Sequence, residues 1–377
     1  MKITRVTCDY LTLPLTIPIR ESQREYGSVL VTIETDAGHR GIGLARNYER
    51  QGLGMRQVVL NDLAPLLQGF DEVVTPGRMW HEAIFELPGK FCRHPEGILN
   101  SALSAVDQAL WDVHGQMLGV PVYQLLGGAQ DEIEVYCTFG FNIYSPEEEQ
   151  AAARRVQAQG FRAFKLQGVD DRGGNVRVAA DRVRRLRETV GEDATIILDA
   201  HNNYTCYEAI ELARLVRPYG VAYIDEPLHA RDHVALRRLR DGAPGVRFAG
   251  RSRGGSLADN RDLVDCGGLE LLGQNVRDQG GYTQGVKAAA LAEVRQMPVV
   301  TGGAWHLQNA HLIAAVTNGW MTEYHLLAAA FCDQIFVDPV QPSGGRLRMS
   351  RRPGLGLTLN EDAAAEARER AARQRAR

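Results

Sequence analysis

Apolar residues recur with two different periods along this chain, and the longest stretch of helical period runs from Ser101 to Leu118. This spacing predicts one long amphipathic helix. Gly119 and Pro121 then break the helix, and a short helix closed by Gly127 and Gly128 is expected to follow. The apolar positions of the long helix are Leu103, Val106, Ala109, Leu110, Val113, Met117 and Leu118.

The first 60 residues or so have the pattern of a β-meander that leads into a helix. Residues 28–34 alternate between polar and apolar side chains, and the sequence Asp36-Ala37-Gly38 is typical of a tight turn. Helical patterns dominate residues 56–126. We therefore expect an N-terminal α+β domain over residues 1–126.

From residue 132 onward, short apolar runs alternate with helical patterns at intervals of roughly two to three dozen residues. Strands that alternate with helices favour a closed parallel barrel, which we place at residues 127–345. A C-terminal segment, residues 346–377, is expected to pack partly on the N-terminal domain and to end in a solvated or frayed helix from about Asn360. The eight expected strands are Ile133–Thr138, Phe161–Leu166, Thr195–Leu198, Ala222–Ile224, Arg247–Ala249, Leu269–Leu272, Pro298–Val300 and Met321–Tyr324.

Charge and composition narrow the class of partner. The chain has 377 residues and a net charge of −3, which lacks the basic excess of a nucleic-acid-binding protein. We find no apolar run long enough to span a membrane and no signal-peptide pattern at the N-terminus. The six cysteines are scattered without metal-binding spacing, so we expect reduced thiols in a cytoplasmic protein.

Polar residues stand where the expected barrel strands end. In a βα barrel, the carboxyl ends of the strands meet at one mouth, and catalytic groups collect there. The sequence therefore predicts a site for a small molecule at this mouth. Its candidate residues are Lys165, Asp199, His201, Glu226, Arg251, Asn275 and Glu323.

The segment 101–128, the IDEP sequence around Glu226 and the order of the strand-end motifs resemble the muconate-lactonizing and mandelate-racemase branch of the enolase superfamily. The resemblance covers about 350 residues. It implies a modified TIM barrel of (β/α)7β type with an α+β capping domain, and assembly into a homo-oligomer. It also implies a small-molecule carboxylate substrate, whose α-proton is removed while a divalent cation stabilises the enediolate.

The resemblance assigns two metal ligands and leaves a third position altered. Asp199 and Glu226 match the first two carboxylate ligands, but Arg251 stands where the third is expected. Guanidinium groups only donate hydrogen bonds and carry a fixed positive charge, so Mg²⁺ binding should be weakened or lost. Arg251 either forks onto the substrate carboxylate in place of the metal, or pairs with Asp199 and Glu226 and fills the site.

The resemblance also points to acid–base residues on the second and third strands. Lys165 matches the first lysine of a two-lysine motif, and we expect it to be a base whose pKa is lowered by a nearby cation. Gln167 replaces the second lysine and can only exchange hydrogen bonds. His201 resembles the histidine with which acid-sugar dehydratases protonate the departing hydroxyl group.

The Asp–His dyad of the racemases is missing, because Asn275 and Gly302 stand at its two positions. His306 is expected to reach the mouth if the loop after Gly302 folds inward, with Asn275 orienting it. His311 is expected to pack within a helix.

The eighth strand carries Glu323, which matches a carboxyl group that hydrogen-bonds the enediolate and which burial would keep protonated. His325 lies two residues later and should share its face of the strand. Trp305 is expected to stack on the substrate or to fill the barrel end. Candidate substrate contacts from the N-terminal domain are Arg20, Arg24, Tyr26, Arg46 and Tyr48.

Three functions fit these residues. The first is an acid-sugar dehydratase, in which Lys165 or His306 removes the α-proton and His201 protonates the leaving group. The second is an isomerase, either a cycloisomerase or a racemase or epimerase, which is metal-independent if Arg251 replaces the third ligand. The third is a non-catalytic carboxylate-binding protein on the same barrel.

Overall fold

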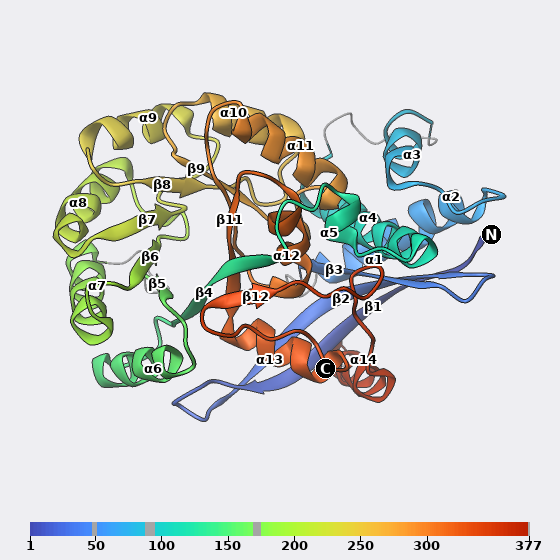
Figure 1. Cartoon of the computed structure of the whole chain (residues 1–377), viewed down its shortest axis with the longest axis horizontal. Coiled ribbons are helices and arrows are strands. Elements are labelled where there is room, and N and C mark those ends of the chain that lie inside the picture. Colours follow the sequence, from blue (N-terminus) through green and yellow to red (C-terminus); the bar gives the residue numbers. More distant parts are fainter. Residues whose placement is uncertain (47–50, 87–94, 169–174, 376–377) are drawn as a thin grey trace.

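Eight parallel strands close into a barrel in the described part of the chain, and an α+β unit lies against its side (Figure 1). The structure, a computed structural model, describes residues 1–46, 51–86, 95–168 and 175–375. Neighbours in the barrel follow chain order, and β11 closes it by pairing with β4. The strands are β4 (Glu132–Gly140), β5 (Ala163–Gln167), β6 (Thr195–Asp199), β7 (Val221–Asp225), β8 (Phe248–Gly250), β9 (Leu271–Gln274), β10 (Val299–Thr301) and β11 (Gly319–His325).

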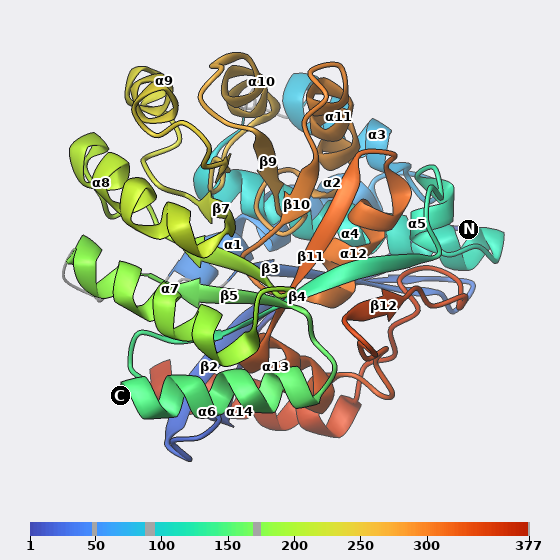
Figure 2. The same cartoon turned by 60° about the vertical axis from the view of Figure 1, so that its left-hand side comes forward.

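All eight predicted barrel strands are confirmed, with ends that shift by no more than two residues. Helices connect the strands and cover the outside of the barrel (Figure 2). Three of them begin with a capping box, in which Ser145, Thr205 or Ser256 accepts a backbone hydrogen bond three residues on. The outer helices are α6 (Pro146–Ala158), α7 (Val176–Val190), α8 (Cys206–Val216), α9 (His233–Gly242), α10 (Leu257–Asp265), α11 (Gly281–Glu293), α12 (His306–Ala315) and α13 (Leu326–Ile335).

The N-terminal unit is the predicted meander followed by helices. Strands β1 (Ile3–Thr16), β2 (Gln23–Thr35) and β3 (Arg40–Arg46) form an antiparallel sheet in that order. The long helix ends as expected, with Gly119 in the left-handed conformation at φ 69°. The helical elements are α1 (Gln51–Gln57), η1 (Val58–Leu63), α2 (Ala64–Gln68), α3 (Pro76–His81), η2 (Glu82–Glu86), α4 (Gly97–Leu118) and α5 (Val122–Leu125).

Helix α4 joins the sheet to the barrel through buried polar side chains. Asp112 accepts backbone hydrogen bonds from Ile42 of β3 and from Leu355, and Asp107 accepts one from Tyr282 of the barrel. Asp107 and Asp112 are no more than 1% exposed. The polar face of this amphipathic helix is therefore an internal seam between two parts of the fold.

Strand β3 lies almost on the backbone of α4. A Cβ atom at Gly43 would stand 1.8 Å from the carbonyl oxygen of Ala105, so only glycine allows this approach. The close contact fixes the sheet relative to the barrel, and with it everything that the sheet carries to the barrel mouth.

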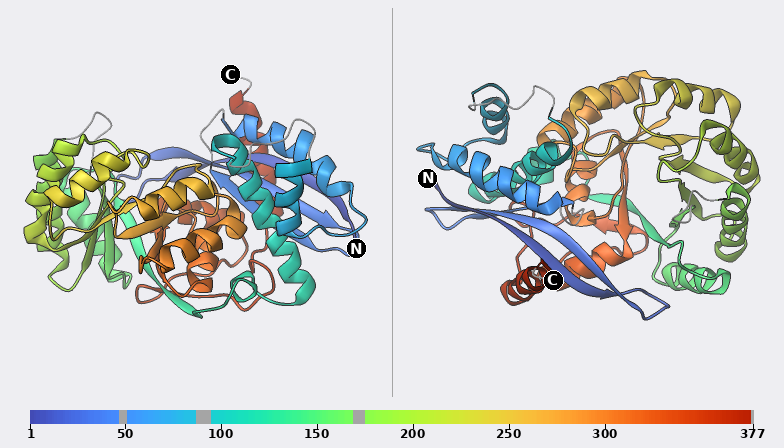
Figure 3. Two further views of the ribbon diagram at one scale, coloured as in Figure 1. Left: turned by 90° about the horizontal axis from the view of Figure 1, so that it is seen from above. Right: turned by 180° about the vertical axis from the view of Figure 1, so that it is seen from behind.

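The β1–β2 hairpin runs across the molecule toward the barrel and reaches α6 (Figure 3). Near its tip, the carbonyl oxygen of Pro18 accepts a hydrogen bond from the hydroxyl of Tyr144, 2.5 Å away. Arg20 donates to Glu148 of α6 over 3.2 Å. The hairpin is thus held at both ends, and its middle lies over the mouth.

The C-terminal segment adds two elements. Strand β12 (Arg346–Arg348), which the sequence pattern did not predict, pairs antiparallel with β4. Helix α14 (Glu361–Arg375) contacts β1 and buries Ala364 and Ala367, so the tail is packed rather than frayed. The division of the chain at residues 126 and 345 into separate domains stays a prediction.

Five cysteines in the described residues are free thiols, and Cys92 lies outside those residues. Within the same residues, none of the helices combines the length and the apolar character that crossing a bilayer requires.

Candidate active site

A cavity of about 350 Å³ opens at the carboxyl ends of the barrel strands, under the β1–β2 hairpin. This volume suits a small ligand. Polar groups dominate the lining. They come from β2 (Arg24, Glu25, Tyr26), from the ends of β5, β6 and β8 (Gln167, Asp199, His201, Arg251, Arg253), from the segments after β9 and β10 (Arg277, Gly303, Ala304, Trp305) and from β11 (Glu323, His325).

Two arginines clamp one carboxylate at the wall of this cavity. Arg251 donates from Nε and Nη2 to the two oxygens of Glu226, each over 3.1 Å. Arg253 donates to the same two oxygens, from Nε over 2.7 Å and from Nη2. The side chains of Arg251 and Glu226 are at most 4% exposed. Burial alone raises the pKa of Glu226, but the two guanidinium groups outweigh it and hold that pKa well below its usual value.

The residues at this wall do not fit a divalent cation. Both oxygens of Glu226 face guanidinium donors, and an oxygen of Asp199 lies 2.9 Å from the ammonium of Lys165. Among the described residues, no group of three or more metal-binding side chains comes together. The expected pair of ligands, Asp199 and Glu226, is therefore taken by positively charged side chains.

The geometry corrects the expectation for Arg251. Its Nε and Nη2 bind Glu226, which is its ion-pair partner in place of the expected two carboxylates, so Nη1 is the nitrogen of Arg251 that remains for a substrate carboxylate. Arg253 was missed by the sequence analysis. It lies two residues after Arg251, and that spacing could have indicated it because alternate residues of an extended segment share a face.

Gly302 makes room for the guanidinium of Arg251. A Cβ atom at Gly302 would stand 2.4 Å from Nη1 of Arg251, well inside a van der Waals contact. Next to it, Gly303, Ala304 and Trp305 all have left-handed backbones, with φ of 78°, 70° and 69°. Such a run is costly and is typical of functional loops.

Lys165 does not match its expected role. Its ammonium lies 2.5 Å from Asp225 and 2.9 Å from Asp199, it is fully buried, and it is not part of the cavity lining. Burial alone lowers the pKa of Lys165, but Asp199 and Asp225 outweigh it and raise that pKa well above its usual value. The expectation of a lowered pKa is wrong, and Lys165 acts here as a fixed positive charge. Asp225, which was not among the predicted site residues, directly precedes Glu226.

Glu323 is also corrected. It accepts hydrogen bonds from the hydroxyl of Thr138 and from the backbone of Ala304, both over 2.5 Å. Burial alone raises the pKa of Glu323, but Lys165 and these two bonds outweigh it and hold that pKa below its usual value. The group is therefore a carboxylate and not the protonated donor that the sequence suggested.

His201 and His325 bring two imidazoles to the cavity. Nε2 of His201 lies 3.4 Å from Asp199, and the side chain is 30% exposed. The backbone of His201 is left-handed, with φ of 49°. His325 shares the inward face of β11 with Glu323, as the spacing predicted. Burial lowers the pKa of His325 to about 4, so its imidazole is neutral at pH 7.

His306 and Asn275 do not take their expected places. His306 is fully buried at the start of α12, is absent from the cavity lining and packs its ring 4.7 Å from that of Tyr324. Burial lowers its pKa to about 3. The amide of Asn275 donates to the carbonyl of Gly302 and accepts from Arg277, so it shapes the loop and does not orient His306. His311 packs inside α12 as expected.

The remaining candidate residues divide into three groups. Arg24, Tyr26 and Trp305 line the cavity, and the rings of Tyr26 and Trp305 lie 5.9 Å apart. Arg20 instead pairs with Glu148. Gln167 also lines the cavity. Tyr48 and the side chain of Arg46 lie outside what the structure describes.

Arg277 was not predicted. It is 1% exposed, lines the cavity and lies 5.1 Å over the ring of Trp305. No motif marks it in the sequence, since it follows β9 as part of an irregular segment.

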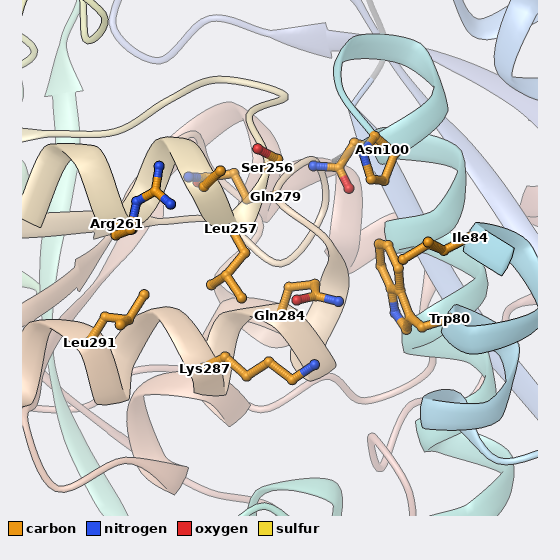
Figure 4. Close-up of a pocket in the computed structure, with 12 residues that line it drawn as sticks. Trp80, Ile84, Asn100, Ser256, Leu257, Arg261, Gln279, Gln284, Lys287 and Leu291 are labelled. Carbon is orange, nitrogen blue, oxygen red and sulfur yellow. The ribbon is translucent and has the colours of Figure 1, made fainter. Parts of the chain in front are cut away.

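A second cavity, of about 410 Å³, lies between the N-terminal unit and helices α10 and α11. Figure 4 shows Trp80 and Ile84 on one side and Leu257, Leu291 and Lys287 on the other. Its described lining contains neither a carboxylate nor an imidazole. Of these two cavities, the one at the barrel mouth is lined by carboxylates and imidazoles.

Family models match nearly the whole chain. The N-terminal domain model of the mandelate racemase and muconate lactonizing enzymes matches residues 2–127, and an enolase C-terminal domain-like model matches residues 147–363. The chain belongs to the enolase superfamily. Within it, the chain falls in the mandelate racemase and muconate lactonizing branch, as the sequence motifs indicated.

Three relatives place this enolase-superfamily member among named enzymes. A 3,6-anhydro-α-L-galactonate cycloisomerase from Streptomyces coelicolor is 30% identical, over 95% of this chain and 97% of that protein. An arabinonate dehydratase from Saccharolobus solfataricus is 28% identical, over 88% of each. A crystal structure of a racemase from Streptomyces coelicolor A3(2) with bound magnesium has a TM-score of 0.86 and 28% identity, over 97% of this chain and 99% of that one.

Proposed function

We propose that this protein is an acid-sugar dehydratase that binds the substrate carboxylate with guanidinium groups in place of a divalent cation. The observation that carries the proposal is His201, backed by Asp199, in a cavity whose other wall carries arginines. The dehydratase and cycloisomerase relatives, at 28% and 30% identity, support a sugar-acid substrate.

Arg251 and Arg253, which we call the arginine wall, supply the positive charge that a bound carboxylate needs. Arg251 and Arg253 share Glu226, and it is the one ion-pair partner of each among the described residues, so the three groups together keep a net charge of +1. Arg277 adds a further cation to the lining. This charge can hold a carboxylate and stabilise the enediolate that forms when the α-proton leaves.

His201 fits the acid that protonates the departing β-hydroxyl. The carboxylate of Asp199 lies 3.4 Å from Nε2 and orients the ring. Its partial exposure lets it meet a ligand. The neighbouring carboxylates do not compete for this task, because Asp199 and Glu323 already hold Lys165, Thr138 and Ala304.

The chemistry is expected to be independent of Mg²⁺, in contrast to the magnesium named with related structures. The magnesium-bound racemase shows that this fold can hold the ion, but here each expected ligand is paired with a side-chain cation. A divalent ion beside Arg251 would meet like charge at close range, which costs several kcal/mol at an effective dielectric constant of about 20.

A cycloisomerase is the second candidate, because the cycloisomerase relative is matched over 95% of this chain. It uses the same proton abstraction, with an internal oxygen as leaving group in place of a hydroxyl. We also propose a cytoplasmic homo-oligomer, which the free thiols and the family fold support.

The test is turnover without metal. The purified protein, stripped with EDTA, is incubated with a panel of aldonic acids, and 2-keto products are trapped with semicarbazide. We expect a 2-keto-3-deoxy acid from at least one substrate, unchanged by EDTA and lost in His201→Asn. His39→Asn, at a half-buried residue beside the β2–β3 turn and outside the cavity lining, is the matched control and should keep full activity.

Three results would count against the proposal. Turnover that disappears with EDTA and returns with Mg²⁺ would contradict the proposal that the arginine wall replaces the divalent cation. Full activity in His201→Asn would contradict the assignment of His201 as the acid that protonates the leaving hydroxyl. Tight binding of sugar acids without any product or exchange of the α-hydrogen identifies a carboxylate-binding protein.

A further inference from the structure

We propose that His325 is the catalytic base that removes the α-proton, on the opposite side of the substrate from His201. This inference rests on the proposed function, which names an acid but leaves the base open because Lys165 and His306 lie outside the cavity lining. His201 and His325 are the two imidazoles among the described residues that line the cavity.

The position of His325 suits a group that faces a ligand. It ends β11, with its ring 5.3 Å from that of Phe141 and 6.4 Å from that of Tyr26. Its Nδ1 is buried and makes no hydrogen bond with any described residue, while the side chain as a whole stays partly exposed. Nε2 is therefore the nitrogen that can meet a substrate. Burial lowers the pKa of His325 to about 4, so the ring is neutral at pH 7 and one of its nitrogens has a free lone pair.

The two histidines approach the cavity from separate strands. His325 follows from β11 and His201 from β6, and β4 and β5 stand between these strands in the barrel. A ligand held by the arginine wall at β8 meets one imidazole from each side. This arrangement matches an elimination in which the proton and the hydroxyl group leave from opposite faces.

The step balances with the groups present. Nε2 of His325 takes the α-proton, and the electron pair of the C–H bond delocalises into the carboxylate, which Arg251 and Arg253 stabilise. The pair then forms the Cα–Cβ double bond while the Cβ–O bond breaks, and the departing hydroxyl takes a proton from His201 and leaves as water. The enol product becomes the 2-keto acid by taking a proton at Cβ and losing one from oxygen, so one water is lost overall.

The residues around His325 do not offer a better base. Glu323 is a carboxylate whose two oxygens already accept hydrogen bonds from Thr138 and Ala304. Asp199 is paired with Lys165. Gln167 cannot take a proton near neutral pH.

The experiment separates the two histidines. Incorporation of deuterium from D₂O at C2 of the substrate is followed by NMR, and product is measured with semicarbazide, for wild type, His325→Asn, His325→Phe and His201→Asn. The phenylalanine variant keeps an aromatic ring between Phe141 and Tyr26, so it tests the nitrogen with the packing preserved.

We expect both His325 variants to lose C2 exchange and product together, by about 100-fold or more. His201→Asn should keep C2 exchange and lose only the product. Added imidazole should restore part of the exchange in His325→Asn, which a purely structural role would not allow.

Exchange within twofold of wild type in both His325 variants would overturn the assignment of the base and leave the proposed function standing. A wild-type protein that neither exchanges nor eliminates any acid of the panel would overturn the proposed function and this inference together.

Discussion

Replacing Gly302 by alanine should push Arg251 off Glu226. The backbone at Gly302 is outside the left-handed region, so alanine is allowed there by its conformation. The obstacle is space, since the new Cβ would stand 2.4 Å from Nη1 of Arg251. A comfortable contact needs about 3.5 Å, so the guanidinium must move by about 1 Å.

The movement breaks a buried ion pair. The two bonds from Arg251 to Glu226 are 3.1 Å long, and a shift of about 1 Å takes them past the limit of about 3.5 Å. Leaving a buried charge without its partner costs about 3–5 kcal/mol, and we take about 3 kcal/mol because Arg253 still holds Glu226. Restricting the unfolded chain with alanine returns about 0.4–1 kcal/mol. The net loss of unfolding free energy is thus about 2 kcal/mol.

The assay is urea unfolding of wild type, Gly302→Ala, Arg251→Ser and the double variant. If the clash with Arg251 is the cause, Gly302→Ala should become neutral or slightly stabilising in the Arg251→Ser background. Gly77→Ala in α3 is the control, because a Cβ there meets nothing within 4 Å. Equal losses from Gly302→Ala with and without Arg251 would refute the reasoning, as would a Gly302→Ala variant as stable as wild type.

Three further predictions concern Arg251, His306 and Arg24. Arg251→Glu alone leaves Arg253 paired with Glu226 and Lys165 paired with Asp199, so we expect little gain in Mg²⁺ affinity by calorimetry. A clear gain is expected only when Arg253→Ser is added. Strong Mg²⁺ binding by the single variant would contradict this prediction. His306 has a pKa of about 3 in the folded protein and an ordinary pKa near 6.5 in the unfolded chain. Its contribution to the free energy of unfolding is therefore fully present above pH 6.5. That contribution falls by about 1.4 kcal/mol per pH unit as the pH drops from 6.5 toward 3. His306→Phe should flatten that slope in urea titrations at pH 6 and pH 4, and an unchanged slope would contradict a neutral buried ring. Arg24→Gln should raise KM about tenfold and leave the melting temperature unchanged, because Arg24 is exposed at the cavity rim; an unchanged KM would remove Arg24 from substrate binding.

The barrel could be predicted because the period of the apolar residues and the polar residues at the strand ends both indicate it. Strands such as Thr195–Asp199 are short apolar runs that end in a polar residue, and the burial of β6 follows that pattern. Strand β12 escaped prediction because Arg346 and Arg348 are polar, and pairing with the edge of β4 holds it in place. The packing of α14 rests on alanines, which give little periodic signal.

The site was only half predictable. Strand ends bring Asp199, His201 and Arg251 to one mouth, as the barrel requires, and Glu226 lies beside them as the ion-pair partner of Arg251. Their charge states were not visible, because each depends on partners brought from other strands. Lys165 illustrates this, as two carboxylates from β6 and β7 turn an expected base into a fixed cation.

The way α4 binds β3 decides how a ligand can enter. Asp107 and Asp112 tie the N-terminal unit to the barrel, and Gly43 brings β3 against the helix backbone. A hinge between the two parts would break these buried hydrogen bonds, so the part of the cover with the weaker attachment is the tip of the β1–β2 hairpin. The tip is held by two polar contacts, to Tyr144 and Glu148, which can break and re-form in water.

The hairpin is therefore a cover that can vary independently of the cavity at the barrel mouth below it. Residues 17–27 could be exchanged for those of a relative to change which sugar acid is admitted, while the imidazoles and the arginine wall below stay in register. Diversification of this enzyme for new substrates would thus change the hairpin first and keep the imidazoles and the arginine wall of the cavity unchanged.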